Sequence, residues 1–355
     1  MDKIKKSSIK KVILVVLIAV VALFIIASAI LVPVLMGQNF SRGEYGKYTA
    51  SYRYEDYKDK YSRTSINFKS GKNTLQGYIY GEDNNKGLVV VSHGIGGGHE
   101  GYINEIIWFV DHGWRVFAYD CTGSCESEGD STRGLPQSAL DLDSALKYIE
   151  KDDSLSKLKV CLFGHSWGGY AVTAVLNFDH KVAASASIAG YAKPMQMIIE
   201  FAEGMMGKFA YAEYPFIWCY NKFLFGENSS LSAVDGINKS DTPVMIVHGE
   251  GDQMIGYDRS SIISKKDEIT NPNVEYYTIS GKYSGHNSIF QSDDVNEYLE
   301  ALDKELDLLS ENYSDGEIPD DILQKFFDKV DKKKSNGVNE EMMEKINRFF
   351  EEAIA

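Results

Sequence analysis

The sequence KVCLFGHSWGG at residues 159–169 contains the feature that decides the fold class. The apolar run 159–163 is followed by the motif GHSWG at 164–168, after which a helical stretch begins. A serine on a sharp strand-to-helix turn projects its hydroxyl above the edge of a sheet, and the strained turn requires glycines because it leaves no room for side chains. We therefore predict that Ser166 is a nucleophile. The N–H of Trp167, at the helix N-terminus, would point at a developing oxyanion.

Segments on both sides of this motif alternate between strand-like and helical patterns. Such alternation requires crossover connections, which predict an α/β fold with a parallel sheet covered by helices on both faces. The predicted strands are 62–69, 74–80, 88–92, 114–119, 159–163, 182–188, 243–247 and 274–279, and the predicted helices include 100–112, 136–150 and one from residue 168.

A serine nucleophile needs a base, and the base needs an orienting carboxylate. Asp252 lies in the loop after strand 243–247, and His286 follows strand 274–279. Ser166, Asp252 and His286 occur in the chain order Ser…Asp…His. Asp258 is the alternative carboxylate, but a catalytic acid is expected to leave the strand end directly. The other six histidines stand in turns, on or beside helices, or at the variable position of the serine motif.

The loop after strand 88–92 is expected to supply a second oxyanion donor. It reads HGIGGG at residues 93–98. We predict that the backbone N–H of Ile95 is this donor, with Gly96 as the alternative.

Residues 191–240 interrupt the alternation and are rich in methionine and aromatic residues. An insertion of this length between two strands predicts a cap over one end of the sheet. Its apolar side chains either pack the cap onto the body or form an apolar cover over a substrate site.

Residues 12–36 are uncharged and mostly apolar, long enough as a helix to cross a hydrocarbon core of about 30 Å. A cleaved signal peptide is the alternative, since residues 27–29 read ASA, but this site lies inside the apolar run. The lysines of residues 1–11 favour a cytoplasmic N-terminus, so the catalytic domain is expected to be extracytoplasmic on a single-pass anchor. We divide the remainder into a juxtamembrane spacer at 37–60, a domain at 61–302 with its cap at 191–240, and a C-terminal helical extension at 303–355.

With these motifs, the chain resembles the α/β-hydrolase superfamily over roughly residues 62–302. The resemblance implies an eight-stranded, mostly parallel sheet and hydrolysis through an acyl-enzyme, with no cofactor and no metal. One loop departs from the family. Many relatives read DxRGxGxS where this chain reads DCTGSCES from Asp120, so Thr122 and Cys125 replace an arginine and a glycine. The shape of this loop is therefore not predicted, and Cys121 and Cys125 form a disulfide or remain two free thiols.

The favoured function is hydrolysis of carboxylic esters with apolar acyl groups, the substrate being a small ester or acyl molecule. A serine peptidase or amidase of the same fold is the alternative, and a non-catalytic surface binding protein is another. Gly96, Gly98 and Gly101 also fit a dinucleotide fingerprint, with Asp120 nineteen residues further on, but the first glycine comes too late after its strand. Net charge is −14 although the N-terminal lysines are basic, which argues against nucleic-acid binding.

Overall fold

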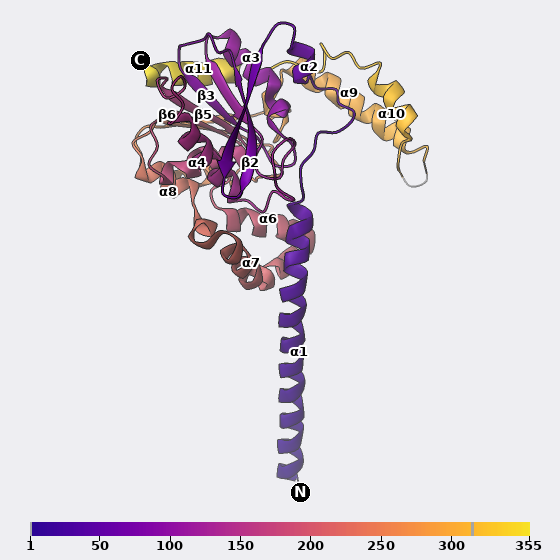
Figure 1. The fold of residues 1–355 in the computed structure, drawn as a ribbon. Coiled ribbons are helices and arrows are strands. Elements are labelled where there is room, and N and C mark those ends of the chain that lie inside the picture. Colours follow the sequence, from indigo (N-terminus) through magenta and orange to yellow (C-terminus); the bar gives the residue numbers. More distant parts are fainter. Residues whose placement is uncertain (1, 314–315) are drawn as a thin grey trace.

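The computed structural model describes residues 2–313 and 316–355 and has an eight-stranded sheet at its centre (Figure 1). Six neighbouring strands are parallel, and the first two along the edge pair antiparallel, as the resemblance implied. In spatial order the strands are β1 (Arg63–Ser70), β2 (Asn73–Tyr80), β4 (Arg115–Tyr119), β3 (Leu88–Ser92), β5 (Val160–His165), β6 (Val182–Ile188), β7 (Val244–Gly249) and β8 (Val274–Ile279).

Helices cover both faces of this sheet, and alternate residues of each central strand point to opposite faces. In β3, Leu88 and Val90 join the core on one face, while Val89 and Val91 join the core on the other. The first face is covered by α4 (Gln137–Ile149), α5 (Trp167–Ala174) and α8 (Ala233–Lys239), and the second by α3 (Ile103–Asp111) and α11 (Glu340–Ile354).

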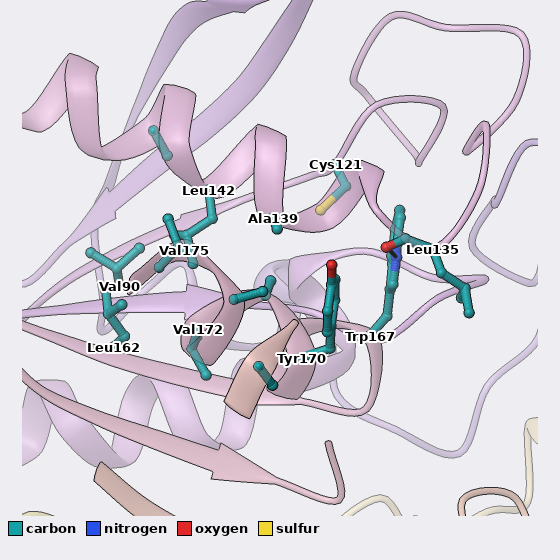
Figure 2. Close-up of a cluster of buried hydrophobic side chains, with 14 of the residues drawn as sticks. Val90, Cys121, Leu135, Ala139, Leu142, Leu162, Trp167, Tyr170, Val172 and Val175 are labelled. Carbon is teal, nitrogen blue, oxygen red and sulfur yellow. Dashed lines mark hydrogen bonds between the residues drawn. The ribbon is translucent and has the colours of Figure 1, made fainter. Parts of the chain in front are cut away.

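Close packing at the first face is visible in Figure 2. Leu142 of α4 and Val172 of α5 lie against Val90 and Leu162 of the sheet, and all four are buried. Each fully buried aliphatic side chain of this kind contributes roughly 1.5–3 kcal/mol. This face therefore holds the start of α5, and with it the turn before Trp167, in a fixed position.

The predicted cap is confirmed as a helical insertion between β6 and β7. It contains α6 (Pro194–Met206) and α7 (Ala210–Phe225), which lie beyond one end of the sheet, and it ends in α8 (Figure 1).

Helix α1 (Asp2–Asn39) projects away from the body, and its C-terminal part lies against the cap (Figure 1). Within the part of the chain that the structure describes, it is the single helix long and apolar enough to cross a membrane, over Ile9–Asn39 with mean hydropathy 3.3. A signal sequence near an N-terminus passes the same test. Val32, Met36 and Phe40 are nevertheless buried against the body.

The expected spacer at 37–60 packs along the body. It contains the short α2 (Tyr54–Tyr57), and Gly43 forms a bridge with Ser124. The Tyr45 hydroxyl accepts a hydrogen bond from the Glu100 N–H at 2.9 Å, so this part of the spacer is held against the domain.

The C-terminal stretch contains α9 (Asp293–Ser310), α10 (Asp320–Phe327) and α11. The helical extension expected at 303–355 contains α10 and α11, and Asn339 caps α11 by accepting a hydrogen bond from the Met342 N–H. Met342, Ile346 and Phe350 are fully buried against the sheet, so α11 is part of the domain core. The domain boundaries proposed from sequence remain a prediction.

Candidate active site

Ser166 stands on the turn between β5 and α5 with backbone angles φ 56° and ψ −111°. This left-handed conformation costs of order 1–3 kcal/mol for a residue other than glycine and is held by the surrounding structure. The Ser166 N–H donates to the Ile188 carbonyl at 2.9 Å. A Cβ on Gly164 would lie 2.3 Å from the Gly168 oxygen, and a Cβ on Gly168 would lie 1.9 Å from the Ser92 oxygen. Both glycines are therefore required for β3, β5 and α5 to approach this closely.

Asp252 and His286 meet at the adjacent end of the sheet. His286 Nδ1 donates to Asp252 Oδ2 at 2.7 Å, and both side chains are buried. Because a carboxylate can only accept, Nδ1 holds the proton, and Nε2 of the neutral ring is free to accept one. Asp258, the alternative carboxylate, is exposed.

Two further groups hold Asp252 in place. Its Oδ1 accepts from the N–H groups of Met254 and Ile255, each at 2.9 Å. His248 Nε2, which donates to the Ile255 carbonyl at 2.9 Å, lies 3.2 Å from Oδ2. Burial raises the pKa of Asp252, but hydrogen bonds from His248 and His286 outweigh it and hold this pKa below its usual value. Asp252 is therefore ionised at neutral pH.

A chain of hydrogen bonds through His165 joins three loops around the serine. The Gly94 N–H donates to the Tyr102 hydroxyl at 3.0 Å, and that hydroxyl lies 2.6 Å from His165 Nδ1. His165 Nε2 donates to the His286 carbonyl at 3.0 Å, which fixes the tautomer and makes Nδ1 an acceptor. Burial and the neighbouring His286 lower the pKa of His165 to about 3. His165 therefore stays neutral and links the loop before Ile95 to the loop of His286.

Sequence analysis missed the positions of His165, Tyr102 and His248 in the site. His165 stands at the variable position of its motif, and His248 precedes a glycine in a turn, so neither had a distinguishing signal. Tyr102 is far from His165 along the chain, and nothing in the sequence indicates their contact.

Ser166, His286, Ile95 and Trp167 all line one cavity of about 420 Å³. That volume lies within the roughly 300–1,000 Å³ of small-molecule sites. The remaining walls come mainly from apolar side chains of α1, α6 and α7.

The backbone N–H groups predicted to bind an oxyanion are available. Among the described residues, none accepts a hydrogen bond from the N–H of Ile95 or of Trp167. The N–H of Trp167 stands in the first turn of α5, where helical N–H groups have no intrahelical partner. Gly96, the alternative donor, has φ 89°.

The loop after Asp120 takes its shape from the N-terminal segment. The Arg42 guanidinium donates to the carbonyls of Cys125, Ser127 and Gly129, the last two at 2.8 and 2.9 Å. Cys125 has φ 44°, a conformation that favours glycine, so it adopts the backbone of the residue it replaces. Cys121 and Cys125 are free thiols, and both are buried.

Asp120 itself does not fit the dinucleotide interpretation. It is fully buried and accepts hydrogen bonds at 2.9 Å from the N–H of His99 and from His99 Nδ1. A carboxylate held in this way has no exposed oxygen for a ribose hydroxyl.

Comparisons with known proteins agree with the fold. The model of the serine aminopeptidase S33 family matches residues 83–216. No curated protein matches the sequence. A solved structure of the Pyrococcus furiosus esterase Pf2001 is similar at TM-score 0.53 and 15% identity, with 75% of this chain and 96% of that chain covered. Another crystal form of that esterase gives TM-score 0.53 at 17% identity, covering 75% and 95%. The α/β hydrolase GrgF from Penicillium sp. sh18 gives TM-score 0.49 at 20% identity, covering 69% and 97%.

Proposed function

We propose that this chain, which has the α/β-hydrolase fold, is a serine hydrolase that cleaves carboxylic esters with apolar acyl groups. One observation carries the proposal. Ser166, on its strained turn, lines the same apolar cavity as His286, whose Nδ1 lies 2.7 Å from Asp252 Oδ2. Together they supply a nucleophile, a base and an orienting carboxylate.

In the proposed mechanism, Ser166 Oγ attacks the ester carbonyl carbon while His286 Nε2 removes its proton. Asp252 keeps the Nδ1–H tautomer and stabilises the imidazolium. The N–H groups of Ile95 and Trp167 bind the tetrahedral oxyanion. The C–O bond then breaks, and His286 protonates the leaving alcohol. Water, deprotonated by His286, attacks the acyl-enzyme and releases the acid.

The acyl preference follows from the composition of the cavity. Its walls are formed by side chains such as Met197, Phe201, Met205 and Ile217, which favour an apolar acyl group over a charged one.

A peptidase or amidase is the second candidate, and one buried carboxylate favours it. Glu213 also lines the cavity, and its Oε2 has no hydrogen-bond partner among the described residues. An ammonium group of a peptide substrate would pair with it. The description of the matching family model points the same way.

Hydrolysis by matched variants tests the proposal. Purified full-length protein is assayed with p-nitrophenyl butyrate and with a panel of amino-acid p-nitroanilides. We expect ester hydrolysis that Ser166→Ala and His286→Ala each abolish by several orders of magnitude while the fold remains intact. Faster turnover of the anilides would select the peptidase. An inactive wild type whose biological effect survives Ser166→Ala would leave the binding-protein alternative.

We also propose that α1 is a retained single-pass anchor with the catalytic domain outside the cytoplasm. The apolar run and the lysines before it support this orientation. C-terminal fusions to alkaline phosphatase and to green fluorescent protein test it. Phosphatase activity without fluorescence is expected, and the reverse pattern would refute the orientation.

A further inference from the structure

We propose that α1 forms one wall of the substrate cavity, and that the substrate is a long-chain acyl ester that enters from the bilayer around α1. This inference rests on the proposed function, because it names the substrate class of the same site. The cavity that Ser166 and His286 line is also lined by Leu31, Leu35 and Met36 of α1. An anchor that merely tethered the domain would not line the cavity that contains the nucleophile.

Contacts along α1 fix this wall in place. The Ser28 hydroxyl donates to Glu213 Oε1 of α7 at 3.0 Å, and both residues are buried. About one helical turn nearer the N-terminus, the ring of Phe24 lies edge-on to the rings of Phe209 and Phe216. The ring centroid of Phe24 is 6.0 Å from that of Phe209 and 5.7 Å from that of Phe216. The docked part of α1 therefore extends from Phe24 to Met36.

The docked part of α1 overlaps the membrane-spanning part. A hydrocarbon core of about 30 Å takes roughly 20 helical residues, so a span that starts at Val12 ends near residue 31. Phe24 and Ser28 lie inside this span, yet both contact the cap. The cap must therefore reach into the lipid layer beside the helix, and the cavity wall at Leu31 and Leu35 lies at its outer boundary.

The outer surface of the cap has the composition that this position requires. Large aromatic side chains that do not line the cavity are exposed on α7, and aromatic residues of this kind gather at membrane interfaces. They are Tyr211, Tyr214, Trp218 and Phe223, the last of which is 86% exposed.

An acyl chain gains from this arrangement because its path avoids water. Transfer of an acyl chain from an apolar environment into water becomes roughly fourfold less favourable with each methylene group. Lateral passage from the bilayer into a cavity lined by Leu31, Leu35 and Phe201 exchanges one apolar environment for another. The ester carbonyl then lies at Ser166 while the acyl chain extends along α1.

A pair of tryptophan substitutions tests the wall directly. Leu35→Trp fills the cavity, whereas Val34→Trp is a matched control because Val34 is 52% exposed and does not line the cavity. Full-length protein in phosphatidylcholine nanodiscs is assayed with p-nitrophenyl acetate and with p-nitrophenyl palmitate. In Leu35→Trp, the larger side chain excludes about two methylene groups of the palmitoyl chain from the cavity. We expect this loss to lower kcat/KM for p-nitrophenyl palmitate roughly tenfold. Both acetate and palmitate hydrolysis by Val34→Trp stay within about twofold of wild type, and Leu35→Trp loses more of its palmitate hydrolysis than of its acetate hydrolysis.

A second pair keeps the test decisive if Leu35→Trp does not fold, which loss of fluorophosphonate labelling would reveal. Leu31 lines the cavity and Ile30 is 64% exposed, so Leu31→Trp and Ile30→Trp repeat the comparison. Palmitate hydrolysis that is equal in Leu31→Trp, Leu35→Trp and wild type would overturn the inference and leave the proposed function standing. A wild type that hydrolyses neither ester would overturn both.

Discussion

Replacing Tyr102 by phenylalanine tests how the hydrogen-bond chain holds the oxyanion loop. The substitution keeps the ring and removes one hydroxyl, which accepts from the Gly94 N–H at 3.0 Å and lies 2.6 Å from His165 Nδ1. Both partners then lose their hydrogen bond in a site that water reaches poorly.

The size of the effect follows from these two lost partners. A buried polar group left without a partner costs about 1–3 kcal/mol. Gly94 is only half-buried and His165 is buried, so we expect a loss of roughly 2–4 kcal/mol in the free energy of unfolding. At about 2–4 °C per kcal/mol, Tm falls by roughly 4–16 °C. Because Gly94 precedes Ile95, the oxyanion donor becomes less well held. We expect kcat to fall roughly tenfold, less than the 10²–10³ that follows complete loss of a donor.

The assay compares Tyr102→Phe with Tyr170→Phe. Tyr170 is also a buried tyrosine, but its hydroxyl donates to the Leu231 carbonyl at 3.0 Å, away from the oxyanion loop. Thermal unfolding in detergent and ester hydrolysis are measured for both. We expect Tyr170→Phe to lose stability and to keep its kcat within about twofold. A Tyr102→Phe variant with wild-type Tm and kcat, or two variants with the same loss of kcat, would refute the reasoning.

Three other perturbations address the rest of the site. Asp252→Asn should lower kcat by about 10⁴ because an amide stabilises the wrong tautomer of His286, as stopped-flow ester hydrolysis would reveal. His165 has its pKa lowered to about 3 in the folded state. Between about pH 6.5 and 3 the proton is therefore taken up by the unfolded state only. The free energy of unfolding decreases as the pH is lowered, by up to roughly 1.4 kcal/mol per pH unit. The decrease in Tm from pH 7 to pH 5 should therefore be smaller in His165→Gln than in wild type. Gly168→Ala should not yield folded protein by gel filtration, since its Cβ would lie 1.9 Å from the Ser92 oxygen.

Local sequence patterns predicted the framework well. The predicted strands 88–92, 182–188 and 274–279 match β3, β6 and β8. Short runs rich in β-branched residues between turn residues favour the strand conformation. The helix expected from residue 168 begins at Trp167. The motif at 164–168 predicted a strained turn because its glycines are spaced for the contacts that the backbone makes there.

Long-range packing could not be predicted in the same way. A membrane-spanning helix is a sufficient explanation for the apolar run of α1. Nothing in that run therefore indicated that Leu35 also lines the cavity. The segment 37–60 has no period, yet Arg42 replaces the cation missing from the loop of Cys125. Tyr102 and His165 meet only because the residue before α3 and the last residue of β5 converge. Such contacts depend on the three-dimensional arrangement of distant segments.

Covalent labelling tests the central claim, that Ser166 is an activated nucleophile, most directly. Wild-type protein is treated with a fluorophosphonate, digested and examined by mass spectrometry. We expect one adduct per chain, on the peptide that contains Ser166, and a large loss of labelling rate in His286→Ala. An adduct on any other residue, or a labelling rate that does not depend on His286, would contradict the account.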